Sequence, residues 1–171
     1  MNFELRTEHL VMRPPGEGDL DDLVAFHDDP LVRKMFGPTT RDEVAEWIAI
    51  ARRDWEVRGH GRVVLRGPDA GTFLGRSGLR RWPGFDEVEV GWSLTAAVRG
   101  RGLATEAGSF WIDWGFRELD APYFTANIDP DNAASIAVAE RLGMAPLRED
   151  TLDGDPVIVY AVRRGQAAKA P

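Results

Sequence analysis

The stretch Arg99-Gly100-Arg101-Gly102-Leu103-Ala104-Thr105-Glu106-Ala107 joins a strand-like run, residues 88–94, to a long amphipathic helix. Its two glycines allow the backbone to turn tightly and to approach a ligand closely. The first peptide N–H groups of a helix have no partner within the helix, so they attract anions, and flanking arginines add charge and donors. The stretch therefore predicts a phosphate-binding corner between a strand and a helix.

The spacing of this stretch distinguishes between known phosphate loops. A Walker loop needs a lysine that is missing here, and a dinucleotide fingerprint needs a third Gly or Ala where Thr105 stands. The pattern Arg-x-x-Gly-x-Ala, from Arg99 to Ala104, resembles the pyrophosphate loop of the GNAT acetyltransferases, which bind the diphosphate of acetyl-coenzyme A (acetyl-CoA). Taken alone, a turn rich in Arg and Gly is equally typical of a plain surface loop.

Further motifs extend the resemblance over residues 5–162. The stretch PDNAASIAVAERLGM (130–144) resembles the second GNAT signature, in which Asn-x-x-Ser precedes a helix ending in Leu-Gly-Phe. The opening LRTEHLVMRP (5–14) resembles the first strand of the RimJ/RimL branch, the ribosomal-protein N-acetyltransferase type. The short motifs DDP (28–30) and EWI (46–48) lie at positions where that branch has similar motifs. Several ordered matches are far more specific than any single one.

Hydrophobic periodicity predicts a protein of the α/β class in the broad sense, with α+β character: one mixed sheet that has helices on both faces. Asp19 is expected to cap a short helix and Thr40 to open a capping box with Glu43. The resemblance implies a GNAT-like fold whose central sheet is mostly antiparallel. Residues 1–163 are expected to form one domain and residues 164–171 a disordered tail. The expected strands are 10–13, 62–66, 72–79, 88–94, 123–127, 144–149 and 157–162.

Composition excludes several classes of protein. There are no cysteines, so a disulfide framework, a thiolate zinc site and a cysteine nucleophile are excluded. The net charge of −7 argues against a general nucleic-acid binder. No apolar run is long enough to span a membrane, and the N-terminus does not resemble a signal peptide, so we expect a cytoplasmic protein. The three histidines are too scattered for a metal site, and no metal is expected.

The resemblance also implies which residues hold the coenzyme. In the GNAT fold the central strand and its parallel neighbour splay apart to admit the pantetheine arm. Here these are the strand ending at Leu94 and strand 123–127. A backbone N–H near residues 91–93 would polarise the thioester carbonyl. The expected coenzyme-binding residues are Trp92, Ser93, Leu94, Arg99, Gly100, Arg101, Gly102, Leu103, Ala104, Thr105, Asn127, Asn132 and Ser135.

Acetyl transfer to an amine needs a group that takes a proton, because an ammonium has no lone pair. Glu89 is the first candidate, since it shares a strand face with Gly91 and Ser93 and borders the expected acetyl site. Solvent and the acids Asp129, Asp150 and Asp153 remain alternatives. Ser135 is the candidate donor toward the leaving thiolate, because Ala139 stands where many GNAT enzymes have a tyrosine.

The sequence thus predicts an acetyl-CoA-dependent N-acetyltransferase of the RimJ/RimL type. The acceptor is expected to be a primary amine, on a small molecule or a protein N-terminus, and a homodimer is one possible assembly. Binding to a membrane or to a nucleic acid is not expected. The alternative is a catalytically silent module that binds acyl-CoA as a sensor or docks a partner.

Overall fold

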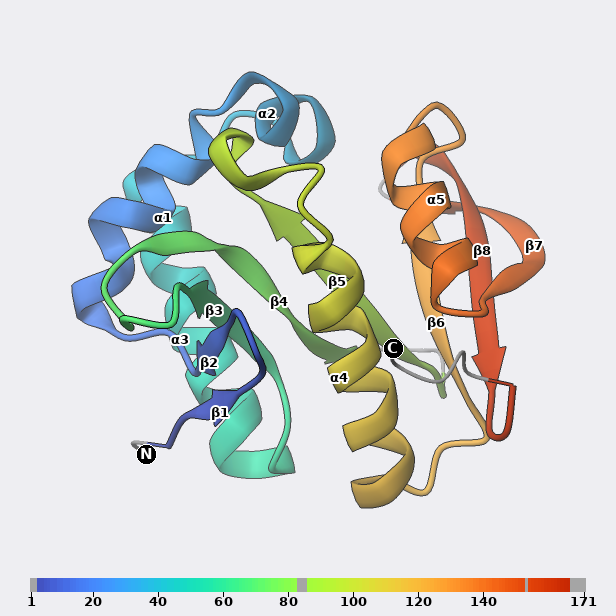
Figure 1. The fold of residues 1–171 in the computed structure, drawn as a ribbon. Coiled ribbons are helices and arrows are strands. Elements are labelled where there is room, and N and C mark those ends of the chain that lie inside the picture. The colour runs from blue at the N-terminus through green and yellow to red at the C-terminus, as the bar shows by residue number, and fades with distance from the viewer. Residues whose placement is uncertain (1–2, 83–85, 153, 167–171) are drawn as a thin grey trace. The chain divides into compact units, whose positions relative to one another are not determined.

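The computed structural model describes residues 3–82, 86–152 and 154–166 (Figure 1). The chain divides into two compact units. The first comprises residues 1–78 with 92–103, and the second comprises residues 79–91 with 104–171. The expectation of one domain over residues 1–163 stays a prediction.

The strands of the described residues form one eight-stranded sheet, which confirms the predicted mixed, mostly antiparallel architecture. The strands β5 and β6 run parallel, whereas the pairs β1–β2, β2–β3, β3–β4, β6–β8 and β7–β8 are antiparallel. Across the sheet the order is β1 (Leu5–Arg6), β2 (Val11–Arg13), β3 (Arg62–Arg66), β4 (Phe73–Arg81), β5 (Val88–Leu94), β6 (Tyr123–Ile128), β8 (Asp155–Arg163) and β7 (Ala145–Leu152).

The first unit contains three α-helices around a small apolar core. They are α1 (Leu20–His27), α2 (Pro30–Phe36) and α3 (Arg41–Arg58), and Figure 1 shows α1 and α3 side by side. The predicted capping box opens α3: Thr40 accepts from the Glu43 N–H, and Glu43 accepts from the Thr40 N–H. Leu23 of α1, together with Val44 and Ile48 of α3, packs against Val64 of β3 in this core. Helix α2 was not expected from periodicity, because at seven residues it is too short to show any.

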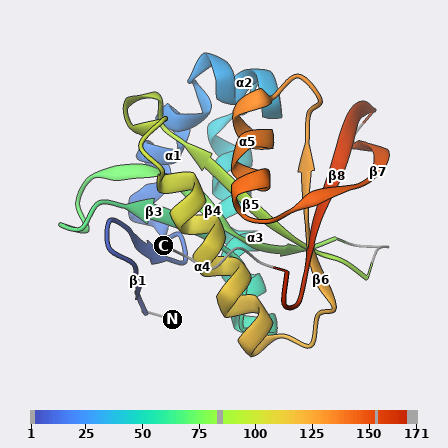
Figure 2. The ribbon, with the colours of Figure 1, turned by 45° about the vertical axis from the view of Figure 1, so that its right-hand side comes forward.

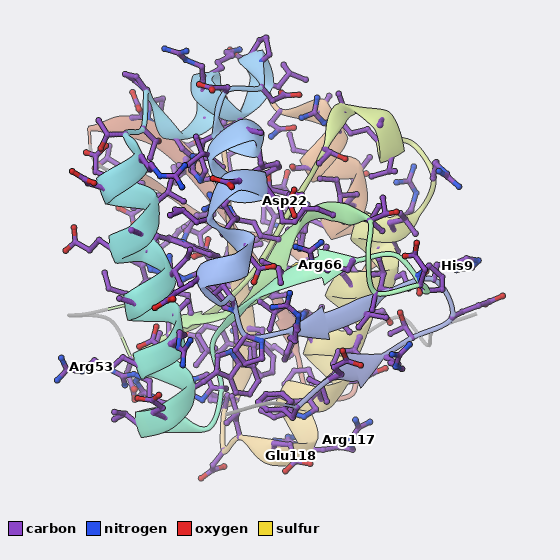
Figure 3. The ribbon with its side chains drawn as sticks, turned by 90° about the vertical axis from the view of Figure 1, so that its left-hand side faces the viewer. His9, Asp22, Arg53, Arg66, Arg117 and Glu118 are labelled. Carbon is purple, nitrogen blue, oxygen red and sulfur yellow. The ribbon has the colours of Figure 1, made fainter. Side chains whose placement is uncertain are left out.

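The prediction that Asp19 caps α1 through its side chain is wrong. Asp19 occupies the N-cap position, at the end of a short 3-10 turn (η1, Glu17–Asp19), but its carboxylate makes no cap hydrogen bond. It is instead completely buried and accepts from both Arg13 and Arg66. Figure 3 shows Arg66, from β3, beside Asp22 of α1, and the two form an ion pair at 2.7 Å. Two arginines therefore outcompete the helix N–H groups for this carboxylate.

The second unit carries the helices α4 (Leu103–Glu118, whose first residue belongs to the first unit) and α5 (Ala133–Arg141). Buried residues of α4 include Ala107, Trp111 and Ile112, and Phe124 of β6 is equally buried. Helix α5 lies alongside β6 (Figure 2). The predicted closing hairpin is confirmed, with strands β7 and β8 longer than expected.

Of the expected disordered tail, residues 164–166 form a turn, in which Arg164 donates to the carbonyl of Phe116 and Gln166 N–H donates to the carbonyl of Arg163. The remaining residues, 167–171, lie outside the described residues. Among the helices that the structure describes, none has the length and apolar character needed to cross a membrane. The cytoplasmic location and the homodimer stay predictions.

Candidate active site

The loop before α4 has the backbone that the sequence predicts for an anion site. Gly100 and Gly102 have φ values of 76° and 81°, a region that residues with a side chain rarely adopt. A Cβ atom built on either glycine would meet no atom within 4 Å, so the space beside this backbone is open. Arg101 between them is exposed, and α4 begins directly afterwards at Leu103. The loop thus leaves room for a ligand at a helix N-terminus.

Arg99 is tied into the first unit. Its Nε donates to the carbonyl of Leu94 at 3.0 Å, and its Nη2 donates to Asp29 at 3.0 Å. The same Asp29 caps α2 by accepting from the N–H of Leu31 and Val32. The hydrogen bond from Arg99 is the main reason why the pKa of Asp29 lies below its usual range. Arg99 therefore connects the loop to α2, and its contact with the coenzyme stays a prediction.

The end of β5 that precedes the loop is fixed by a close approach of β4. A Cβ atom on Gly75 would lie 2.2 Å from the carbonyl oxygen of Ser93, so only glycine permits this backbone separation. The Thr95 N–H donates to the carbonyl of Leu74 at 2.9 Å and continues the contact. Ser93 and Leu94 are buried here, whereas Trp92 is partly exposed. Their predicted role in coenzyme binding is not contradicted by this placement and stays a prediction.

Glu89 lies in the second unit, where β5 and β6 pair through Glu89 and Thr125. Three N–H groups donate to its carboxylate. The indole Nε1 of Trp82 donates to Oε2 at 2.9 Å, and Asn127 donates to Oε1 through its side-chain Nδ2 at 3.2 Å and its backbone N at 3.4 Å. A carboxylate offers about four lone-pair positions, so among the described residues one position on Oε2 is left for a proton.

Burial raises the pKa of Glu89 above its usual value, because desolvation disfavours the charged form. The nearby positive charge of Arg80 and the hydrogen bonds from Asn127 and Trp82 oppose this effect without reversing it. A carboxylate with a raised pKa is a better proton acceptor than an ordinary one near neutral pH. Such a group at the end of a short parallel pairing is the most chemically distinctive feature of the second unit.

Three other acids of the second unit, Glu87, Asp150 and Asp129, are engaged in structural contacts. Arg148 makes a bidentate pair with Glu87, at 2.8 Å to each oxygen, and contacts Asp150 at 3.2 Å. These contacts help to lower the pKa of both carboxylates; for Asp150 the backbone N–H of Thr151 contributes most. Asp129 is exposed and accepts from the Asp131 N–H at 2.8 Å.

Asn132 caps α5 as predicted, since its Oδ1 accepts from the Ser135 N–H at 3.1 Å. Ser135 lies in the first turn of this helix and is partly exposed. The cap therefore fixes the backbone that carries the Ser135 hydroxyl. The contacts of both residues with the coenzyme arm, and the role of Ser135 toward the thiolate, stay predictions.

The hydrogen-bond partners of Glu89 were not expected from the sequence. No role beside Glu89 was predicted for Trp82, and residues 83–85, which follow it, lie outside the described residues, as does Asp153. A hairpin between β4 and β5 is the feature that brings Trp82 to Glu89. The Trp82 backbone N–H donates to the carbonyl of Glu87 at 3.3 Å, and this contact places the indole beside Glu89. Asn127, predicted to bind coenzyme, is brought to the same carboxylate.

Comparison with known proteins identifies the family. Residues 9–145 match the model described as the acetyltransferase (GNAT) domain. The chain belongs to the GNAT acetyltransferases. An acetyltransferase from Agrobacterium tumefaciens str. C58 has a similar structure, with a TM-score of 0.82, 31% identity and 95% of each chain covered. The uncharacterized protein YkkB of Bacillus subtilis is 28% identical over 161 residues, covering 92% of this chain and 94% of that protein.

A putative ribosomal-protein-serine acetyltransferase from Vibrio cholerae shares the fold, with a TM-score of 0.80 at 17% identity, over 95% of this chain and 98% of that one. The match to the family model over residues 9–145 confirms the RimJ/RimL-type resemblance seen in the sequence, and this GNAT protein is an N-acetyltransferase. Membership of the family implies the use of acetyl-CoA and of an acyl acceptor. The open backbone at Gly100 and Gly102 fits the diphosphate of that coenzyme.

Proposed function

We propose that this GNAT acetyltransferase transfers the acetyl group of acetyl-CoA to a primary amine by direct attack, with Glu89 as the general base. The observation that carries the proposal is the partly buried carboxylate of Glu89, which has a raised pKa and three N–H donors. The amine attacks only in its neutral form, so a group must remove its proton. The free position on Oε2 takes that proton, directly or through one water.

The remaining residues hold the reactants. The amides of the loop around Gly100 and Gly102 bind the diphosphate, and Arg101 adds positive charge at the surface. The thioester of the bound coenzyme supplies the acetyl group. Ser135 donates a hydrogen bond toward the sulfur, as a weak donor rather than a matched acid. Holding both reactants in line contributes most of the rate, up to about 7–11 kcal/mol in favourable cases.

Glu89 is favoured over Glu87 and Asp150 because its pKa is raised by burial, whereas the pKa values of the other two carboxylates are lowered by their hydrogen bonds. Glu87 and Asp150 hold Arg148, which helps to keep their pKa values low and makes them weak bases. Asp129 is exposed and supports a turn. The acceptor is a small amine or the N-terminal amine of a protein, and the net charge of −7 suits the approach of its protonated form.

A thiol-release screen tests the proposed transfer. Purified protein is incubated with acetyl-CoA and a panel of small amines and short peptides, and free coenzyme thiol is measured with a disulfide reagent. Because the chain contains no cysteine, every thiol that appears belongs to the coenzyme. We expect thiol release that depends on an amine. Binding of acetyl-CoA without thiol release across the panel would instead support a silent acyl-CoA module.

Substitution of Gly102 by Val should weaken acetyl-CoA binding by about tenfold or more, and more than Arg101→Ala does. A β-branched residue at φ 81° strains the backbone by about 1–2 kcal/mol, and its side chain enters the open space beside the loop. Calorimetric titration with acetyl-CoA measures both variants. Gly154→Val is the matched control, since Gly154 has φ 96° and open surroundings in the β7–β8 hairpin. Unchanged affinity of Gly102→Val would refute the loop assignment.

A further inference from the structure

We propose that Trp82 is a positioning residue that selects Oε2 of Glu89 as the proton-accepting atom. The proposal rests on the proposed role of Glu89 as general base and adds to it. The indole Nε1–H of Trp82 occupies one lone-pair position of Oε2 at 2.9 Å, while both donors of Asn127 lie on Oε1. The carboxylate is thus held from both ends and keeps one defined position for the proton of the acceptor.

The backbone around Trp82 supports such a role. Trp82 directly follows β4, and its N–H closes the hairpin by donating to the carbonyl of Glu87. The neighbouring Arg81 forms an ion pair with Asp86 across the same hairpin. These contacts fix the point from which the indole extends, so its N–H is held in place before a substrate binds. Preorganised donors of this kind need no rearrangement during the reaction.

Arg80 stacks on the indole ring of Trp82. Its guanidinium carbon lies 3.7 Å from the centroid of the Trp82 ring, an arrangement typical of a cation–π interaction. A cation over the ring attracts its electron density, which makes the indole N–H a stronger donor. The positive charge of Arg80 also acts on Glu89 directly and opposes the rise in its pKa. The pair Arg80–Trp82 therefore favours the charged, proton-accepting form of Glu89.

Among the described residues, Arg80 of β4 is the charged group that acts on Glu89. Glu87 lies just before β5, two positions from Glu89, and its contacts connect it to Tyr123 of β6 and to Arg148 of β7, which also binds Asp150. Arg148 neutralises Glu87 through a bidentate pair, and the Tyr123 hydroxyl also donates to Glu87. Among the described residues, Trp82, Asn127 and Arg80 are left to stabilise the charge of Glu89, so loss of the indole N–H should be directly measurable.

Trp82→Phe keeps an aromatic ring for Arg80 but removes the donor. A hydrogen bond to a charged group contributes about 1.5–3 kcal/mol, so the pKa of Glu89 should rise by about one unit or more. Carbon-13 NMR of glutamate-labelled protein measures this pKa without any substrate. The acidic limb of the kcat/KM profile should move to higher pH by the same amount. Arg80→Met, which keeps the apolar stem, should move the limb in the same direction.

Trp55→Phe is the matched control, because the indole of Trp55 donates at 3.0 Å to the backbone carbonyl of Arg62 and not to a carboxylate. It should leave both the pKa of Glu89 and the acidic limb unchanged. A folded Trp82→Phe protein with an unshifted Glu89 pKa would overturn the positioning role, even if Glu89→Gln abolishes turnover. A shifted pKa with an unmoved acidic limb would support the hydrogen bond but overturn the catalytic part of the inference and the base assignment.

Discussion

Glu89→Gln should lower turnover by about 10²–10⁴-fold, the range typical of the loss of a general base. Glutamine has nearly the same shape and can still accept at one oxygen from Trp82 or Asn127. Because the substitution removes proton-accepting capacity and little else, acetyl-CoA affinity should stay within about twofold of the native protein. Steady-state kinetics and calorimetric titration measure the two quantities on the same sample.

The pH profile gives the same variant a second readout. Glu89 acts as a base only when it is deprotonated, so activity falls as the pH falls through its pKa. Because burial raises that pKa, the acidic limb should lie above the value of about 4.3 that is usual for Glu. In Glu89→Gln this limb should be lost. Acceptor amines of different pKa distinguish it from titration of the substrate, since a limb that belongs to Glu89 does not move with the acceptor.

Ser135→Ala provides the contrast for this experiment. Its hydroxyl is only a weak donor toward a thiolate that leaves readily, so about a tenfold loss of turnover is expected, below the range for a matched acid. If Glu89→Gln instead produced the small effect and kept its acidic limb, solvent or another acid would be the base. Of the described alternatives, Asp150 would then need to release Arg148 before it could accept a proton.

Structural features that depend on residues close together in the chain could be predicted from the sequence. The capping box of Thr40 and Glu43, the Asn132 cap and the glycine loop before α4 depend on residues within a few positions of one another, and the structure contains all three features as expected. Such local preferences are visible in a single sequence, because the competing partners lie close by in the chain.

Contacts between distant residues could not be read in this way. Arg99 was assigned to the diphosphate because it flanks the glycine loop, and the sequence did not indicate that it also pairs with Asp29, 70 positions away. No pattern in the sequence places Trp82 beside Glu89, whereas hairpin geometry brings its indole there. Asp19 has the sequence context of a helix cap, and only the folded sheet brings Arg66 to it from 47 positions away. In each case the partner is brought close only by folding, and for Asp19 the charge-assisted bonds outweigh the local preference for a helix cap.

Asp19→Asn should destabilise the protein by about 3–5 kcal/mol, because it removes one member of a buried ion-pair network and leaves two arginines without their shared charge. Asp19 is completely buried, and its oxygens accept from Arg13, Arg66 and the Gly16 N–H at 2.6–2.7 Å. Asp22→Asn is the matched control: its side chain is 45% exposed and shares only Arg66, so it should cost less than about 1 kcal/mol. Urea unfolding at pH 7 measures both values.

The pH dependence of the same variant tests whether charge is responsible. Burial alone would raise the pKa of Asp19, but the hydrogen bonds from Arg13, Arg66 and the Gly16 N–H outweigh it, so the pKa is lowered. A carboxyl with a lowered pKa in the folded state stabilises the protein fully above its unfolded pKa of about 3.9, and this contribution is lost as the pH falls through the folded pKa. The difference in unfolding free energy between native protein and Asp19→Asn should therefore be constant near neutrality and shrink below about pH 4. A difference that stays the same in acid would mean that the amide N–H groups of Asn, which face the donors of Arg13 and Arg66, and not the lost charge, cause the destabilisation.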